Sequence, residues 1–240
     1  MTAETAPAPR ALRPRLTFAL PDGSTREVEV ARLLNAGYAG REQDEVRAHI
    51  AELAELGVPA PTTTPALYPV APYLAAQTDV VPVQHARTSG EAEWALVVTE
   101  DDVLLTVACD HTDRALEVHG VAWSKNASPD VLGTAAWRLD DVRDHLDDIA
   151  LRGWVTGTDG VRTLVQDSTL GDLLTPDHWL GVLRERGLDR PGTVLASGTV
   201  AMLPGVDQFA PRWDVELHDP VTDLRITAGY DVEVMPEPVG

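Results

Sequence analysis

The chain has 240 residues, of which 44% are hydrophobic and 24% are charged. This composition is enough to bury a large core, so we expect either one ample domain or a domain with a small N-terminal extension. The 38 acidic residues outnumber the 19 basic ones and give a formal charge of −19, which repels nucleic acid phosphates and anionic membranes. We therefore expect neither nucleic acid nor a membrane as a partner. An acidic surface also favours solubility, so the charge alone indicates little about chemistry.

The single cysteine, Cys109, excludes an intramolecular disulfide and is typical of a reducing compartment. No apolar stretch approaches the roughly 18 residues that a membrane span requires. Residues 1–15 mix Ala, Pro, Thr and Arg without a continuous apolar core, so we interpret them as a frayed leader and not as a secretory signal. A cytoplasmic location follows from these features.

The N-terminal part of the chain predicts a hairpin and then a helix. Residues 16–20 and 26–30 alternate in polarity around an Asp-Gly turn, as the two strands of a hairpin do. From residue 42 to 56, apolar residues recur at spacings of three and four, and Gly57 follows, which is typical of an amphipathic helix. Residues 59–72 are rich in Pro and Thr and predict an extended or looped segment that leads to short apolar runs near Val80 and Val83.

Short strands dominate the remainder of the chain. Two apolar runs, 94–98 and 103–109, are followed by a polar segment that extends to residue 129 and by a short helix or turn at 139–149. We then expect a hairpin of strands 155–159 and 162–166, a helical turn at 168–174, a helix at 176–186 capped by Thr175, and strands at 193–197, 213–218 and 223–230. Many short strands without a regular βα alternation predict a mainly β sandwich or roll with peripheral helices, of the α+β class.

A pair of alternating carboxylates, Glu91 and Glu93, opens the first apolar run, and Asp110 ends the second. If both runs are strands, Glu91 and Glu93 project from one face, and Asp110 lies at a neighbouring strand end. Three such anions beside buried strands repel one another unless a cation neutralises them, and oxygen ligands suit Mg²⁺, Mn²⁺ or Ca²⁺. The alternative is that both glutamates form the solvent-facing side of an amphipathic strand. Residues 110–114 favour a site, because two acids, an imidazole and a guanidinium lie within five residues.

Three further sets of residues are candidates for chemistry. His49 and Glu52 are three residues apart on the predicted helix, so they are neighbours on one face and could form a water-activating pair or a plain surface pair. Lys125 could stabilise an enolate or an oxyanion, although lysines are usually solvated. Gly198 and Thr199 follow a predicted strand and could bring backbone amides and a hydroxyl close to a ligand, or simply form a strand-to-turn junction.

Other kinds of site fit the sequence poorly. It contains no Gly-x-Ser-x-Gly elbow, no Gly-rich phosphate loop, no paired cysteines and no His-Glu-x-x-His motif. Cys109 lies inside an apolar run, where a thiol is commonly a packing residue, so we do not expect it to be a nucleophile.

In this order, the motifs resemble those of the fumarylacetoacetate hydrolase superfamily. The family's pattern contains an Asn-Tyr segment, a His-x-x-Glu helix, a proline-rich passage, Glu-x-Glu, Asp-x-x-x-Arg, a lysine and a late Gly-Thr. The counterparts in this chain are Asn35 and Tyr38, His49 with Glu52, residues 59–72, Glu91 with Glu93, Asp110 with Arg114, Lys125, and Gly198 with Thr199. The chain looks most like an uncharacterised bacterial branch of the superfamily.

The resemblance runs from about residue 35 to the C-terminus, so it implies a catalytic domain at residues 35–240, with residues 1–34 and their hairpin as an N-terminal extension. It also implies a mixed β-sandwich roll, a homodimer, and Mg²⁺ or Mn²⁺ held by Glu91, Glu93 and Asp110. It also implies catalytic roles for His49, Glu52 and Lys125, with Arg114, Lys125 and Thr199 contacting substrate. The activity that it implies is metal-dependent hydrolysis of a carbon–carbon bond in a small dioxo or oxo-carboxylic acid of the acylpyruvate type. Decarboxylation, hydration or isomerisation of a related 2-oxo acid is an alternative, as is a non-catalytic module that binds a small acid.

The sequence departs from the family pattern at several positions. Ala115 follows Arg114 where the family often has aspartate, and Val200 follows Thr199 where it often has proline. No aspartate follows Lys125 at the usual distance of three residues. The first two of these differences leave the predicted metal ligands intact and concern the substrate.

Overall fold

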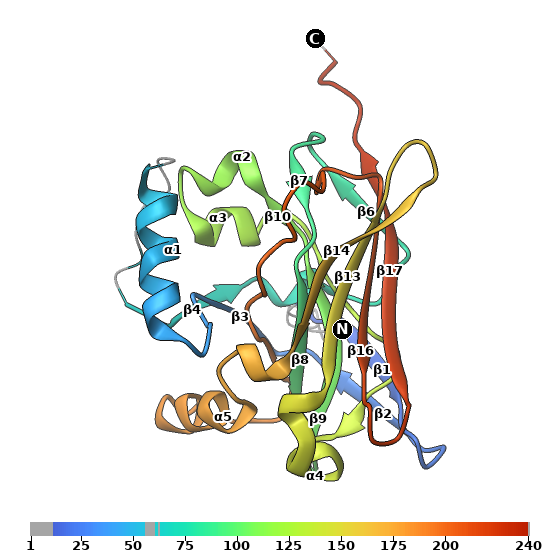
Figure 1. The fold of residues 1–240 in the computed structure, drawn as a ribbon. Helices are drawn as coiled ribbons and strands as arrows, with labels where there is room; N and C mark the ends of the chain where they lie inside the picture. Colours follow the sequence, from blue (N-terminus) through green and yellow to red (C-terminus); the bar gives the residue numbers. More distant parts are fainter. Residues whose placement is uncertain (1–11, 56–60, 62, 240) are drawn as a thin grey trace, which may run out of the picture.

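The structure is a computed structural model that describes residues 12–55, 61 and 63–239. It is predominantly β, with a few helices around two large sheets (Figure 1). This agrees with the mainly β, α+β architecture that the sequence predicts. Among the described residues, no helix combines the length and the apolar composition that crossing a bilayer requires.

The larger sheet is mixed and carries the longest buried runs of the sequence. Its strands, in spatial order, are β4 (Ala66–Val70), β3 (Arg32–Gly37), β15 (Thr193–Ala196), β8 (Ala92–Val98), β9 (Val103–Asp110), β11 (Asp130–Leu132) and β5 (Ala75–Ala76), and β12 (Trp137–Arg138) also pairs with β9. The β3–β15 and β11–β5 pairs are parallel, whereas β8 and β9 form an antiparallel pair. Every residue of β8 is buried, as expected for a central strand covered on both faces.

The smaller sheet packs against one face of the larger one. Its order is β14 (Arg162–Thr169), β13 (Ala150–Thr156), β16 (Arg212–His218), β17 (Arg225–Val234) and β6 (Val80–Val83). Side chains that alternate inward from both sheets form the main core, including Trp94, Leu105, Leu151 and Val215. The predicted 155–166 hairpin is confirmed as β13–β14, and its two strands are longer than the sequence indicated.

The predicted N-terminal hairpin is confirmed and covers the opposite face of the larger sheet. Its strands are β1 (Arg15–Ala19) and β2 (Thr25–Glu29). Phe18 and Val28 pack in a second core with residues such as Ala95 and Val97 of β8. The boundary predicted at residue 35 falls inside β3, and the assignment of residues 1–34 as an extension stays a prediction.

The helices are short and lie around the sheets. They are α1 (Gln43–Glu55), α2 (Arg114–Glu117), α3 (Val121–Lys125), α4 (Leu139–Val142) and α5 (Pro176–Glu185), with 3₁₀ turns η1 (Pro72–Leu74), η2 (Arg143–Asp148) and η3 (Leu170–Asp172). The predicted Thr175 cap is confirmed, since its hydroxyl accepts a hydrogen bond from the His178 amide. The sequence missed α2 and α3, because helices of four and five residues are too short to show a period.

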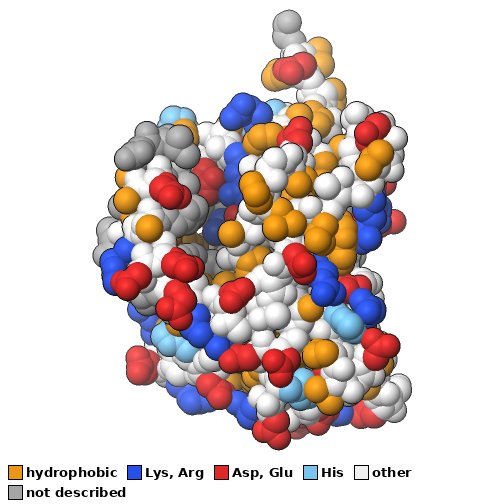
Figure 2. Space-filling model, viewed as in Figure 1, with side chains coloured by type: hydrophobic (Ala, Val, Ile, Leu, Met, Phe, Trp, Pro, Cys, Tyr) orange, Lys and Arg blue, Asp and Glu red, His pale blue; other side chains and the backbone are white. Residues whose placement is uncertain are grey.

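A small ribbon of β7 (Thr88–Ser89) and β10 (Thr112–Asp113) lies next to α2. Helices α2 and α3 stand beside α1, over the end of the larger sheet (Figure 1). A space-filling view from the same side shows a hollow between α1 and the rest of the molecule (Figure 2). The candidate site lies at the base of this region.

Candidate active site

The candidate site forms where one face of the larger sheet extends past the cover of the N-terminal hairpin. Glu91 and Glu93 alternate with Ala92 and Trp94, so they share a face with Ala95, which packs under the hairpin. Strand pairing sets the Asp110 amide 3.1 Å from the Glu91 carbonyl oxygen, and Asp110 is in register with Asp130. Carboxylates from three neighbouring strands therefore meet at one end of the sheet.

The three predicted metal ligands lie close together. One carboxylate oxygen from each of Glu91, Glu93 and Asp110 lies within 4.8 Å of the others. Glu93 and Asp110 are 0% exposed and Glu91 is 8% exposed, so the interpretation of the glutamates as a solvent-facing strand edge is wrong. Buried carboxylates at this separation need compensating positive charge.

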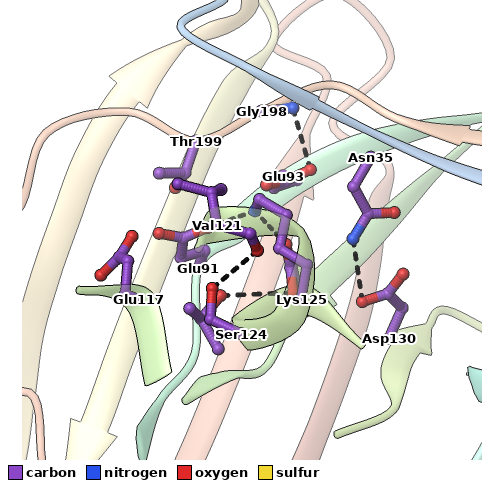
Figure 3. A network of polar contacts seen from close by, with 12 residues as sticks. Asn35, Glu91, Glu93, Glu117, Val121, Ser124, Lys125, Asp130, Gly198 and Thr199 are labelled. Atoms are coloured by element: carbon purple, nitrogen blue, oxygen red, sulfur yellow. Dashed lines mark hydrogen bonds and ion pairs between the residues drawn. The ribbon is translucent and has the colours of Figure 1, made fainter. Parts of the chain in front are cut away.

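Lys125 supplies part of that charge from the end of α3 (Figure 3). Its Nζ donates to Glu91 Oε2 over 3.1 Å and also to Asp110 Oδ2. Burial opposes ionisation of the amine, but the surrounding carboxylates raise the pKa of Lys125 well above its ordinary value. Lys125 is the only lysine in the chain, and the other basic side chains are arginines and histidines. That compositional signal could have singled it out in the sequence.

Arg114, the first residue of α2, compensates Glu91 from the other side. Its Nη2 donates to Glu91 Oε1 over 2.7 Å, its Nη1 lies 3.2 Å from Glu117 Oε2, and its Nε donates to Ser89 Oγ over 2.8 Å. Burial opposes ionisation of Glu91, yet Lys125 and Arg114 together lower its pKa to about 2. Glu91 is therefore held as an anion.

Glu93 is less well compensated. The Gly198 amide donates to its Oε2 over 2.9 Å, from a backbone turn with φ of +80° that favours glycine. Its other oxygen, Oε1, is buried and has no hydrogen-bond partner among the described residues. Burial, with Asp110 and Glu91, raises the pKa of Glu93 well above its ordinary value, against the opposing effect of Lys125. An unpaired, buried carboxylate oxygen beside two others has the donor chemistry of a divalent cation site.

Asp130 is a site residue that the sequence analysis missed. It begins β11 opposite Asp110, and the Asn35 side-chain amide donates to its Oδ1 over 3.2 Å. Burial raises the pKa of Asp130 well above its ordinary value, and Asp110 and Glu93 add to this effect. The superfamily's pattern has an aspartate three residues after the lysine. In this chain the acid at the site follows Lys125 by five residues, which the motif spacing did not reveal.

Thr199 lies beside the cluster but is tied to the sheet. Its hydroxyl donates to the Ala92 carbonyl over 2.9 Å and accepts from the Gln166 amide over 2.7 Å. Gln166 also accepts a bond from the Ala92 amide. These bonds fix the 198–200 segment over the end of β8, next to Glu91 (Figure 3).

A buried polar chain supports the end of β9 from the main core. The ring of His111 bonds to the Tyr230 hydroxyl through Nδ1 at 2.8 Å and to Thr88 Oγ1 through Nε2 at 2.9 Å. Burial, together with Arg114, lowers the pKa of His111 to about 3, so the ring is neutral near pH 7. The Cys109 thiol lies 3.2 Å from the same hydroxyl, and burial raises its pKa, in agreement with its interpretation as a packing residue.

A pocket of about 320 Å³ reaches Glu91 and Lys125. Residues of the β3–α1 connection, α1, α2, α3 and the 199–201 segment line it. From α1, the lining includes Glu45 and Val46 but not Glu52, which is exposed one to two turns further along. His49 lies in α1, but its side chain is outside the described part of the structure. The predicted His49 and Glu52 pair therefore stays a prediction.

Solved structures with a similar fold include several enzymes. 2-Keto-3-deoxyarabinonate dehydratase is 14% identical over 89% of this chain and 77% of its own, with a TM-score of 0.63. The same enzyme complexed with magnesium and 2,5-dioxopentanoate is 15% identical over the same shares of both chains, with a TM-score of 0.59. Cg1458 with an inhibitor is 20% identical over 88% of this chain and 81% of its own, with a TM-score of 0.59. These proteins belong to the fumarylacetoacetate hydrolase superfamily, and at such identities the similarity establishes the fold alone.

No curated protein matches the chain in sequence. One family of proteins does match, from the end of β3 to the middle of β17. The match covers residues 36–230, well over half of the chain, and the chain therefore belongs to the family described as protein of unknown function DUF2848.

Proposed function

We propose that this protein is a divalent-metal-dependent enzyme that acts on a small 2-oxo carboxylic acid. The observation that carries the proposal is the convergence of Glu91, Glu93 and Asp110 beside Lys125 at the base of a pocket, with Glu93 Oε1 unpaired among the described residues. A superfamily enzyme of the same fold binds magnesium together with a dioxo acid, which supports this assignment.

The residues fit a metal ion in charge as well as in donor type. The cluster has three carboxylates, those of Glu91, Glu93 and Asp110. Two cations, Lys125 and Arg114, are in direct contact with them. Hard divalent ions such as Mg²⁺ or Mn²⁺ prefer such oxygen ligands. When bound, the ion would supply a Lewis acid that holds an oxo acid and stabilises a developing enolate.

The protein's own groups would position the substrate and handle charge. Lys125 lies where an ammonium group can steady a developing anion at the base of the pocket. Thr199 lines the same pocket, and its fixed hydroxyl would orient the substrate. Arg114 stays a predicted substrate contact, and its bond to Glu91 adds the role of orienting that carboxylate.

For the reaction, we propose hydrolysis of a carbon–carbon bond in an acylpyruvate-like acid, with His49 and Glu52 as the water-activating pair. Dehydration of a 2-oxo acid is the second candidate, because a dehydratase is among the proteins that share the fold. We also propose that the sheets correspond to the β-sandwich roll of the superfamily and that the protein is a cytoplasmic homodimer.

Calorimetric titration of Mg²⁺ and Mn²⁺ into metal-free protein tests the metal site. We expect Glu93→Gln to weaken binding at least about tenfold, because a neutral amide replaces an anionic ligand while it can still accept the Gly198 bond. Glu100→Gln, in the exposed β8–β9 turn, is the matched control and should bind the metal as the wild type does. Equal binding by the wild type and Glu93→Gln would contradict the assignment.

Mass analysis of products from a panel of acylpyruvates and 2-oxo-3-deoxy sugar acids separates the two reactions. Hydrolysis gives two smaller acids from an acylpyruvate, whereas dehydration removes one water from the sugar acid. Binding of these acids without any product would identify a non-catalytic module instead. Undiminished turnover by His49→Ala would exclude the proposed base.

A further inference from the structure

The pocket above the candidate metal ligands has a charge distribution that restricts the substrate. Its charged lining side chains among the described residues are Glu45, Glu91, Glu117 and Lys125. Lys125, the single cation in this set, lies at the base and bonds to Glu91 and Asp110. Among the described lining residues, positive charge therefore lies only where the reacting end of an oxo acid would lie.

Arg114 lies nearby, but it is engaged by residues of the protein. Each of its three nitrogens is within hydrogen-bond distance of a protein oxygen: Nη2 of Glu91, Nη1 of Glu117 and Nε of Ser89. It is also absent from the pocket's described lining. A carboxylate at the outer end of a bound molecule therefore meets no cation other than Lys125 on the pocket's described lining.

The outer part of the pocket carries negative charge instead. Glu117 of α2 and the exposed Glu45 of α1 line the pocket, and both are less buried than Lys125. Figure 3 shows Glu117 beyond Glu91 on the side away from Glu93. Arg114 offsets part of the charge of Glu117, and the two lining carboxylates together repel a second carboxylate on a ligand.

The remaining wall is mostly small and aliphatic, with Tyr38 and Thr199 as its uncharged polar residues. Its apolar side chains are those of Ala36, Ala39, Val46, Val121, Val200 and Ala201. A volume of about 320 Å³ is enough for a short chain of carbons but not for a bulky group. Burial of methylene groups against this wall is favourable, whereas burial of an unpaired charge there is not.

We propose that the pocket selects 2-oxo monocarboxylic acids with a short, uncharged, aliphatic tail and rejects those with a second carboxylate. This inference rests on the proposed function, because it assumes that the oxo-acid end is held at the metal ligands and Lys125. Glu45 and Glu117 are the specificity-determining residues, acting by repulsion at the tail.

Binding of 2-oxopentanoate and 2-oxoglutarate, measured by calorimetry at saturating Mg²⁺, tests the proposal. The two acids have the same oxo-acid end and the same number of carbons, and they differ in a terminal methyl or carboxylate group. We expect 2-oxopentanoate to bind at least about tenfold more tightly. Glu117→Gln should reduce this ratio of affinities, mainly because 2-oxoglutarate binds the variant more tightly. Glu45→Gln should also reduce the ratio, and it leaves the contacts of Arg114 unchanged.

Glu185→Gln on the exposed end of α5 is the control, and it should leave the ratio unchanged. Equal binding of the two acids by the wild type would overturn this inference and leave the proposed function standing. The same holds for a ratio of the two affinities that neither Glu117→Gln nor Glu45→Gln changes. If Mg²⁺ binds but neither acid binds with it, the proposed function fails, and the inference fails with it.

Discussion

At the scale of single residues, the behaviour of each carboxyl group at the site depends on its neighbours. Glu91 and Glu93 are the same residue type and lie two positions apart on one strand face. The pKa of Glu91 is lowered to about 2 because Lys125 and Arg114 contact it, whereas burial beside Asp110 raises the pKa of Glu93. The sequence predicts that both side chains share a face, but the difference between them comes from residues on other elements.

Lys125→Met tests how far the buried amine compensates the carboxylates. We expect this variant to lose about 3–5 kcal/mol in free energy of unfolding without metal, because Glu91 and Asp110 lose a buried cationic partner. Saturating Mg²⁺ should restore part of the loss, since a divalent ion would supply the missing charge. Urea unfolding in chelator and in Mg²⁺ measures both effects.

The comparison variant is Arg152→Met, which removes a surface ion pair with Asp167. It should cost less than about 1 kcal/mol in either condition, because exposed pairs contribute little. An equally small cost for Lys125→Met would show that the amine does not compensate the cluster.

At the scale of elements, short segments at strand ends deliver the residues that surround the carboxylates. Asp113 caps helix α2, because its Oδ1 accepts bonds from the Ala115 and Leu116 amides, and this cap sets the position of Arg114. The turn after β16 is held in a similar way, because Asp219 accepts bonds from the Val221 amide at 2.8 Å and from the Thr222 hydroxyl at 2.7 Å. Such local bonds fix short elements that the hydrophobic pattern does not predict.

The Asp219 turn predicts a pH-dependent stability. Burial raises the pKa of Asp219, but the Thr222, Val221 and His145 contacts outweigh it, and the net pKa is lowered. A lowered folded-state pKa stabilises the fold above the unfolded value of about 3.9, and this contribution is lost as the pH falls through the folded value. We expect Asp219→Asn to cost about 1.5–3 kcal/mol at pH 7, and the difference from wild type to shrink below about pH 4.

Urea unfolding of both proteins at pH 7 and pH 3.5 measures this effect. Asp101→Asn is the control, since Asp101 is exposed and its carboxylate has no hydrogen bond among the described residues. It should match the wild type at both pH values. A cost for Asp219→Asn that does not change with pH would argue against ionisation as its source.

At the scale of the whole molecule, the larger sheet lies between two cores, and the site lies where one of them ends. The smaller sheet covers one face through the main core, and the β1–β2 hairpin covers part of the other. The carboxylates continue the face under the hairpin, beyond the residues that the hairpin buries. The hairpin therefore supports the strands that carry Glu93 and Asp110.

Phe18→Ala tests whether the hairpin is integral to the fold. Phe18 is 0% exposed in the second core, so its truncation should cost about 3–5 kcal/mol through lost burial and the cavity that remains. Val161→Ala, at a side chain that is 57% exposed, should change stability by less than about 0.5 kcal/mol. Thermal unfolding measures both, and a small cost for Phe18→Ala would support a separable N-terminal extension.

Much of the fold follows from local sequence patterns. The N-terminal hairpin, the strands around residues 94–109, and the α5 cap at Thr175 are each specified by a few consecutive residues, and all are confirmed. The strand bounds differ, since β17 extends to Val234 and the predicted strand ended at Tyr230, because pairing with β6 continues it. Pairing partners lie far apart in sequence, so they leave no local signal.

The sequence by itself determined that Glu91 and Glu93 share a strand face and that Asp110 ends the next strand, because side-chain alternation is a local property. Tertiary structure decided that this face is buried, that Asp130 and Asn35 join it from other strands, and that α3 brings in Lys125. It also decided which acidic side chains line the pocket, since Glu45 and Glu117 lie more than 70 residues apart in the chain. Such convergence depends on packing between distant elements, which no spacing of residues along the chain encodes.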